Sequence, residues 1–176
     1  EITENDFIIG DENAPITIIE YASMSCSHCA DFHTNTLPDL KTEYIDTGKV
    51  RMVFRDYPFN YPALLGSMMM RCIPSDVRYD YMNALYQLQP SWVNRDPKIT
   101  KTELYKIMQS GGMTKEEFDT CYGNLDNENL ILEGVMAAQK DFNIKSTPSF
   151  VINGNLIEGN KNIKEFRQII DKILSE

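Results

Sequence analysis

Two cysteines separated by two residues, Cys26 and Cys29 in the stretch "SCSHC", constrain this chain of 176 residues more than any other feature. The apolar, β-branched segment 14–23 leads directly into the pair and predicts a buried strand. The segment after the pair has the apolar spacing of a helix, which Pro38 is expected to kink or break and Gly48 to end. The pair is therefore predicted to lie where a strand passes into a helix.

The pattern then predicts one more strand, followed by a stretch that contains helices only. Residues 49–58 alternate between apolar and polar side chains, as a strand does, so the chain is expected to begin β-α-β. From about Pro62 the spacing of apolar residues is helical. Thr-x-x-Glu sequences at 100–103 and 114–117 each fit a capping box and predict two helix starts.

The C-terminal part predicts the order α-β-β-α. A helix is expected at about 127–142, and Asn153-Gly154 lies between two short strand segments, which is a strong hairpin signal. The last helix is predicted to start near Asn162, with Glu165 three residues further on. The chain should therefore end with a hairpin that is covered by a helix.

The order of these elements sets the expected fold class, which is α/β. A β-α-β half and an α-β-β-α half flank an all-helical block, and the chain has no repeats and no long flexible linker. We expect one discontinuous α/β domain, formed by residues 1–60 and 126–176, with a helical insertion domain at residues 61–125.

Charge and composition exclude several classes of function. The chain has 17 basic and 26 acidic residues, a net charge of −9, which argues against nucleic acid or anionic lipid as the main partner. No apolar run approaches the roughly 20 residues that span a bilayer. The chain begins at Glu1, so we expect that a signal segment was removed or that the sequence is trimmed. Four cysteines, an even number, suit an oxidising compartment.

A metal site is the first interpretation of the cysteine pair, and the number of ligands argues against it. Cys29 and His33 are four residues apart and could share a helical face, with Cys26 as a third ligand. Structural zinc takes four ligands, and the two other cysteines, Cys72 and Cys121, are single residues in distant predicted helices. We expect no metal and no cofactor.

A purely structural disulfide is the second interpretation. A disulfide that closes a loop of two residues removes little chain entropy, so it would add little to the stability of the fold. Its position, directly between a strand and a helix, is also poorly suited to a passive crosslink. This interpretation is therefore also weak.

A redox site is the third interpretation, and it uses the position at the start of a helix. With Ser25 as the predicted N-cap, Cys26 falls in the first turn, where free N–H groups and the helix dipole favour a thiolate. Cys29 lies almost one turn further in, where it is more buried and can exchange with Cys26. His28 can offer a hydrogen bond or a positive charge to the Cys26 sulfur. The spacing therefore predicts thiol–disulfide exchange.

The combined motifs resemble a known family. A strand that leads into "CSHC", an inserted helical block and "STP" before a strand are similar to the DsbA-type thiol oxidoreductases of the bacterial periplasm, in the thioredoxin superfamily. The resemblance covers essentially the whole chain and implies a thioredoxin fold with an inserted all-helical domain. It implies that Cys26 is the nucleophile and Cys29 the resolving cysteine.

The resemblance also implies roles for residues outside the pair. Thr147-Pro148 matches the family's cis-proline loop, which faces the two sulfurs and pairs with an extended peptide substrate. Glu20 has the place of a buried acid that relays a proton to or from Cys29, the alternative being an outward-facing charge on an edge strand. DsbA proteins usually have proline where this chain has Ser27, so the oxidising strength is not carried over unchanged.

The resemblance bears on the two remaining cysteines as well. Some DsbA relatives, particularly among alphaproteobacteria, have an additional structural disulfide in the helical insertion, which would pair Cys72 with Cys121. The alternative is that the two are buried free thiols that act as small apolar residues.

These features predict a periplasmic thiol:disulfide oxidoreductase that introduces disulfides into unfolded or folding secreted proteins. By resemblance, its partners are cysteine-containing polypeptides and a membrane quinone-coupled reoxidant of the DsbB type. We expect a monomer, and membrane anchoring through residues outside this chain is left open. One alternative is a disulfide isomerase or reductase with the same site, because isomerases of the superfamily also have a threonine at the position of Thr147. Another is a noncatalytic peptide-binding module.

Overall fold

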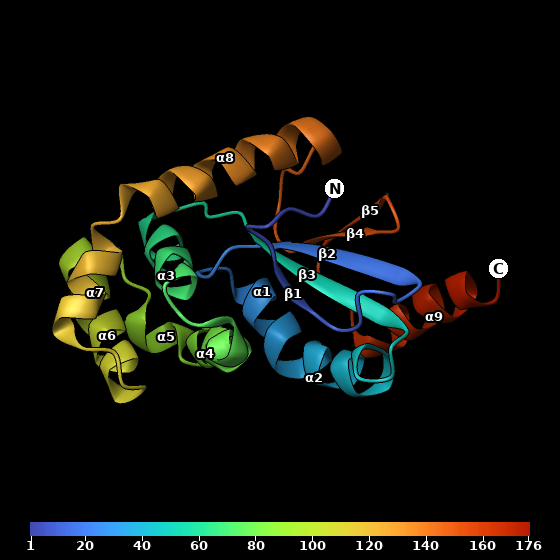
Figure 1. Cartoon of the computed structure of the whole chain (residues 1–176), viewed down its shortest axis with the longest axis horizontal. Helices are drawn as coiled ribbons and strands as arrows, with labels where there is room; N and C mark the ends of the chain where they lie inside the picture. Colours follow the sequence, from blue (N-terminus) through green and yellow to red (C-terminus); the bar gives the residue numbers. More distant parts are fainter.

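The structure is a computed structural model that describes all residues, 1–176, and its centre is a five-stranded mixed sheet (Figure 1). The strands lie in the order β1-β3-β2-β4-β5. The central pair, β2 and β3, is parallel, and the other three pairs are antiparallel. Their bounds are β1 (Phe7–Ile9), β2 (Ile16–Ala22), β3 (Val50–Asp56), β4 (Ser149–Ile152) and β5 (Asn155–Glu158). The fold class predicted from the sequence is confirmed.

One long helical stretch connects the two central strands. It consists of α1 (Ser27–Asp31), η1 (Phe32–Thr36), α2 (Leu37–Leu40) and η2 (Lys41–Ile45), in which η1 and η2 are turns of π-helix. Pro38 does not break it, because a widened π turn directly before α2 accommodates the proline, which occupies one of the first helical positions of α2. The predicted disturbance therefore takes the form of a wide turn.

The helical insertion lies beside the sheet, on the left in Figure 1. Its helices are α3 (Tyr61–Arg71), α4 (Ser75–Gln87), α5 (Gln89–Trp92), α6 (Pro97–Ser110) and α7 (Lys115–Tyr122). Thr114 is the N-cap of α7, as predicted, and accepts from the N–H of Glu117. The predicted start at Thr100 is wrong, because α6 begins at Pro97 with Asp96 as its N-cap, and Thr100 is buried within the helix.

Two helices cover opposite faces of the sheet. The long helix α8 (Leu125–Phe142) extends from the insertion over one face, and α9 (Ile163–Leu174) packs under the other (Figure 1). The β4–β5 hairpin turns at Asn153 and Gly154, which have φ angles of 46° and 86°, as the sequence predicts. Strand β1 was not predicted from the sequence. The domain bounds at residues 61 and 125 stay a prediction.

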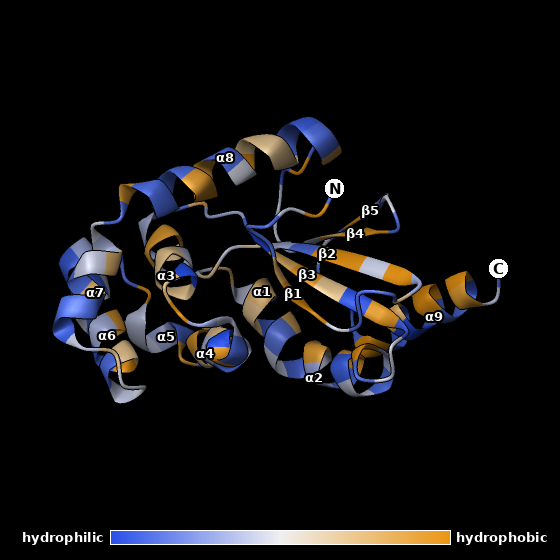
Figure 2. Ribbon diagram, viewed as in Figure 1, coloured by the Kyte–Doolittle hydropathy of each residue, from blue (hydrophilic) through white to orange (hydrophobic).

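The sheet is apolar on both faces, which fixes the packing of its strands. Figure 2 shows mainly hydrophobic residues along β2, interrupted by polar ones, and six of its seven residues are buried, as in a strand covered on two sides. On the face of the long helical stretch, the rings of Phe32, Phe150 and Phe166 contact one another with centroids 4.8–5.6 Å apart. None of the helices is both long and apolar enough to cross a membrane.

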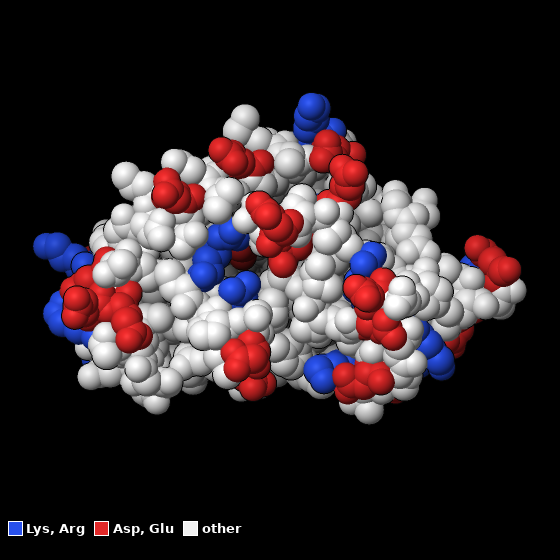
Figure 3. All heavy atoms as spheres, viewed as in Figure 1, with Lys and Arg blue, Asp and Glu red and all other residues white.

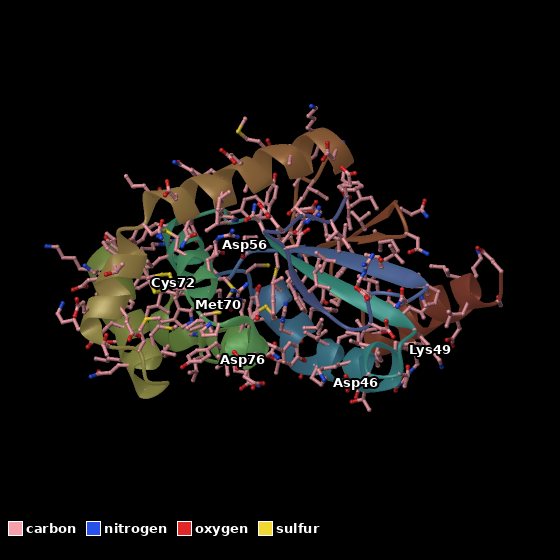
Figure 4. The ribbon with its side chains drawn as sticks, in the orientation of Figure 1. Asp46, Lys49, Asp56, Met70, Cys72 and Asp76 are labelled. Atoms are coloured by element: carbon pink, nitrogen blue, oxygen red, sulfur yellow. A yellow bond between two sulfur atoms is a disulfide. The ribbon has the colours of Figure 1, made fainter.

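A disulfide between Cys72 and Cys121 crosslinks the helical insertion. Cys72 follows the last residue of α3 (Figure 4) and Cys121 lies in α7, with Cα atoms 6.2 Å apart and a sequence separation of 49 residues. The sulfur of Cys121 is buried against the helical core. The bond therefore ties together two ends of the block that are distant in sequence.

Replacing both Cys72 and Cys121 by alanine should lower the free energy of unfolding by about 4 kcal/mol, because the unfolded chain regains the freedom of a loop of this length. Urea unfolding of a Cys26→Ala/Cys29→Ala background, with and without the two further replacements, measures the difference without interference from the other cysteine pair. An unchanged midpoint would show that the disulfide adds nothing to stability.

Candidate active site

Cys26 lies at the turn where β2 passes into α1, and it is the N-cap residue itself. Its φ and ψ of −79° and 123° are non-helical, and its sulfur accepts the N–H of Cys29 at 3.3 Å. The prediction that Ser25 is the N-cap is therefore wrong. The Ser25 hydroxyl donates instead to Asn60 Oδ1 at 2.9 Å, because the helix starts one residue later. The Cys26 sulfur thus caps the free N–H groups directly.

This environment strongly favours the thiolate of Cys26. Its pKa is lowered to about 5, first by the hydrogen bond with the Cys29 side chain, and further by the Thr147 side chain and the N–H groups of Cys29 and His28. Partial burial opposes this shift, but it is outweighed. At neutral pH the reduced protein therefore carries a negative charge on Cys26.

Cys29 has the opposite character. It is fully buried, and burial is the main cause that raises its pKa above the ordinary value for a thiol. The hydrogen bond with Cys26 and the negative charge of Glu20 raise the pKa further. The two sulfurs, three residues apart, thus have different roles available to them: one is a partly buried anion and the other a fully buried thiol.

The loop around Pro148 faces the Cys26 sulfur. The Thr147–Pro148 peptide bond is cis, and the Cys26 thiol lies 3.6 Å from the Thr147 carbonyl, to which it can donate. Pro148 is buried, and its carbonyl accepts from the Gly159 N–H at 2.9 Å, which anchors the loop on the sheet. The predicted pairing of this loop with a peptide stays a proposal.

The two residues between the cysteines are exposed. Ser27 is the first residue of α1, and the imidazole of His28 makes no hydrogen bond with the Cys26 sulfur, whereas its backbone N–H favours the thiolate. Any effect of the His28 side chain must therefore act through its charge. Its role in the chemistry stays a prediction.

Glu20 lies beneath the pair, inside the molecule. Its side chain points from β2 toward η1, where Oε1 is 2.7 Å from Nε2 of His33. Sequence reasoning considered His33 only as a metal ligand, and it missed this pairing. The available signal was that His33 follows Cys29 by four residues, so it shares the inward face of the helix with the buried sulfur. No group of three or more His, Cys, Asp or Glu side chains is arranged to hold a metal.

The helical insertion contributes a further residue that the sequence did not reveal. The side-chain N–H₂ of Gln89, the first residue of α5, donates to the carbonyls of Met24 at 2.9 Å and Cys26 at 3.0 Å. These carbonyls belong to the turn that carries the sulfur. Gln89 therefore fixes the main chain at the site from the neighbouring block.

A family model described as thioredoxin matches residues 2–172. This chain belongs to the thioredoxin family. Within it, the structural match with a DsbA over nearly the whole chain, insertion included, makes it a DsbA-type member of the superfamily.

Three relatives illustrate the match. A Rickettsia bellii relative named as a protein-disulfide oxidoreductase is 31% identical over 179 residues, which cover 100% of this chain and 67% of the relative. A Rickettsia conorii relative with a similar name is 28% identical, and the chain spans 63% of its length. The crystal structure of Wolbachia pipientis alpha-DsbA1 superimposes with a TM-score of 0.92 and 30% identity, over 99% of this chain and 93% of the other.

Titration of the reduced protein should show one thiolate that forms with a midpoint near pH 5, because the groups around Cys26 stabilise the anion. Ultraviolet absorbance of the thiolate measures the curve, and a Cys26→Ser variant should lack this step. A midpoint near the ordinary value for cysteine would contradict the site described here. His28→Leu then tests the imidazole: a raised midpoint gives its charge a part in stabilising the thiolate.

The same shift predicts how stability depends on pH. Because the pKa of Cys26 is lower in the folded state than the ordinary thiol value of 9.0, the thiolate stabilises the reduced fold fully above about pH 9. This contribution is lost as the pH falls through about 5. Urea unfolding of the reduced wild type and of Cys26→Ser should therefore diverge as the pH rises from 5 to 9, and parallel curves would contradict the prediction.

Proposed function

We propose that this chain is a thiol:disulfide oxidoreductase that introduces disulfides into unfolded or folding secreted proteins through a redox disulfide between Cys26 and Cys29. The observation that carries the proposal is the asymmetry of the two sulfurs, one a stabilised anion and the other a buried thiol. The name of the Rickettsia bellii relative and the likeness to alpha-DsbA1 support the same reaction class.

The reaction begins with a substrate thiolate, which attacks the Cys26 sulfur of the oxidised pair. A bond forms between the substrate sulfur and Cys26, and the bond to Cys29 breaks, so that Cys29 takes the electron pair and then a proton. A second substrate thiolate attacks the substrate sulfur of this mixed disulfide. The Cys26 thiolate leaves easily because its pKa is low, and the substrate departs oxidised with both active-site cysteines reduced.

Two further residues have proposed roles in this cycle. The loop at Thr147 and Pro148 would hold the substrate chain beside the sulfur through backbone hydrogen bonds. Glu20, buried below Cys29 with its charge acting on that thiol, would supply and recover the proton. Ser27 and His28 would complete the site at its exposed edge.

Regeneration of the disulfide requires an oxidant. We propose a membrane quinone-coupled partner of the DsbB type, with the protein acting as a monomer in the bacterial periplasm. The family assignment supports this setting, in which disulfides persist.

Oxidised protein should restore activity to reduced, unfolded ribonuclease, because the low pKa of Cys26 makes its disulfide a good electron acceptor. Recovered ribonuclease activity and thiol trapping measure the exchange. A Cys26→Ala variant should be inactive. Cys29→Ala, given disulfide-containing ribonuclease instead, should accumulate a mixed disulfide between Cys26 and the substrate, because the second thiol that resolves it is missing.

The alternative function, disulfide isomerisation or reduction, uses the same residues with a different redox balance. Reduced protein incubated with scrambled ribonuclease tests it. Rescue of the scrambled substrate alone would replace the oxidase by the isomerase, and no exchange in either assay would leave the noncatalytic peptide-binding module.

A further inference from the structure

The pair formed by Glu20 and His33 is the one buried ion-pairing contact in the neighbourhood of the cysteines. Its two side chains are 1% and 0% exposed, respectively, and Oε1 of Glu20 lies 2.7 Å from Nε2 of His33. The imidazole stacks on the ring of Tyr86 at 4.1 Å between centroids, and Phe32 and Phe54 close the other sides. A net charge among these aromatic rings costs free energy. The contacts of the two side chains must therefore show how many protons the pair holds.

Asn83 of α4 decides which nitrogen of His33 carries a proton. Its Oδ1 lies 3.1 Å from Nδ1 of His33. An amide oxygen can only accept a hydrogen bond, so the ring nitrogen that faces it must be the donor. Nδ1 of His33 therefore bears a hydrogen.

This tautomer has a consequence for the contact with Glu20. A neutral imidazole that carries its hydrogen on Nδ1 has only a lone pair on Nε2. A carboxylate oxygen also offers only lone pairs, so a separation of 2.7 Å requires a proton between the two atoms. The pair must then be a carboxylic acid beside a neutral imidazole, or a carboxylate beside an imidazolium.

We propose that Glu20 and His33 store one proton between them, and that Asn83 positions His33 so that this proton is available to Cys29 when the disulfide opens. This inference rests on the proposed function, and it adds His33 and Asn83 as the residues that keep Glu20 supplied with a proton. Glu20 Oε2 is buried and has no partner, so it is the oxygen free to exchange a proton.

Titratable groups lie around the pair on the elements packed against it. They are Cys26 and Cys29 from the start of α1, Arg55 and Asp56 from β3, Arg71 from α3, and Arg78 and Tyr86 from α4. Glu20 lines a pocket with Asp56, Arg71 and Arg78, and Figure 3 shows basic and acidic atoms around a hollow in the middle of this face. Figure 4 places Asp56 at the end of β3 that borders the insertion. The two arginines offset the negative charge that remains on the pair after it gives up its proton.

When the substrate thiolate bonds to Cys26, the electron pair of the broken disulfide bond goes to the Cys29 sulfur. The proton held by Glu20 and His33 passes to that sulfur, which leaves a carboxylate beside a neutral imidazole. In reoxidation, the proposed partner first forms a mixed disulfide with Cys26. Cys29 then gives its proton back to the pair, and its thiolate attacks the Cys26 sulfur, which forms the Cys26–Cys29 bond and releases the partner's sulfur as a thiolate.

Imidazole nitrogen NMR tests the stored proton directly. The chain has only two histidines, so in a His28→Ala variant all imidazole signals belong to His33. In the oxidised protein at neutral pH, Nδ1 should show the shift of a protonated nitrogen. An unprotonated Nδ1, with the hydrogen on Nε2, would overturn the inference, because His33 would then donate to a carboxylate and no proton would be stored.

The rate constant for reduction of the disulfide by dithiothreitol, corrected for the concentration of dithiothreitol thiolate, tests whether the stored proton takes part in the reaction. Asn83→Leu should let the ring adopt the other tautomer and lower the rate constant about tenfold, less than the roughly 100-fold or more typical of losing a catalytic acid, since Glu20 remains. Asn83→Asp, which still accepts from Nδ1, should restore the rate. As a control, Thr36→Val removes a partly buried hydrogen bond to the Lys161 carbonyl from η1, the helical turn that contains His33. This variant should keep the wild-type rate.

The outcomes separate this inference from the proposed function. If Asn83→Leu keeps both the wild-type tautomer and the wild-type rate while the protein oxidises ribonuclease, the positioning role of Asn83 is refuted and the oxidoreductase stands. If the wild type fails to exchange disulfides, the proposed function fails, and the NMR of His28→Ala still decides the protonation of His33. That measurement needs no change in the core, so it does not depend on how the Asn83 variants fold.

Discussion

The hydrogen bond from the N–H of Cys29 to the Cys26 sulfur is the interaction on which the site depends. It makes the nucleophile part of the helix cap, so the first turn of α1 helps to stabilise the anion. The same turn directs Cys29 into the core, where burial disfavours the anion. One element of local structure thus creates the chemical difference between two identical side chains.

The sheet prepares this arrangement. Because β2 is covered on both faces, every side chain along it must be accommodated inside the molecule, and Glu20 is the one acid among them. A buried carboxyl group needs a partner, which η1 supplies as His33. His33 in turn requires Asn83 from the insertion. A polar chain thus extends from the centre of the sheet into the helical block.

The sequence predicted the parts of this structure that depend on local pattern. The strand before the cysteines, the Asn153-Gly154 hairpin and the α/β class follow from periodicity and turn chemistry, which act over a few residues. The N-cap was misplaced by one residue, since Ser25 and Cys26 can both cap a helix and the contact with Asn60 decides. Asn60 and Gln89 were missed because their partners lie 35 or more residues away, where sequence pattern carries no signal.

Through Gln89, the insertion contributes directly to the structure of the active site. Two carbonyls of the loop that presents the nucleophile are held by one amide that belongs to the neighbouring block. The position of the reactive sulfur therefore depends on both the thioredoxin-like part and the insertion. A movement of one relative to the other would displace the sulfur. A thioredoxin fold with the same "CSHC" sequence but without the insertion would lack this donor for the two carbonyls. Other contacts would then be needed to fix the loop.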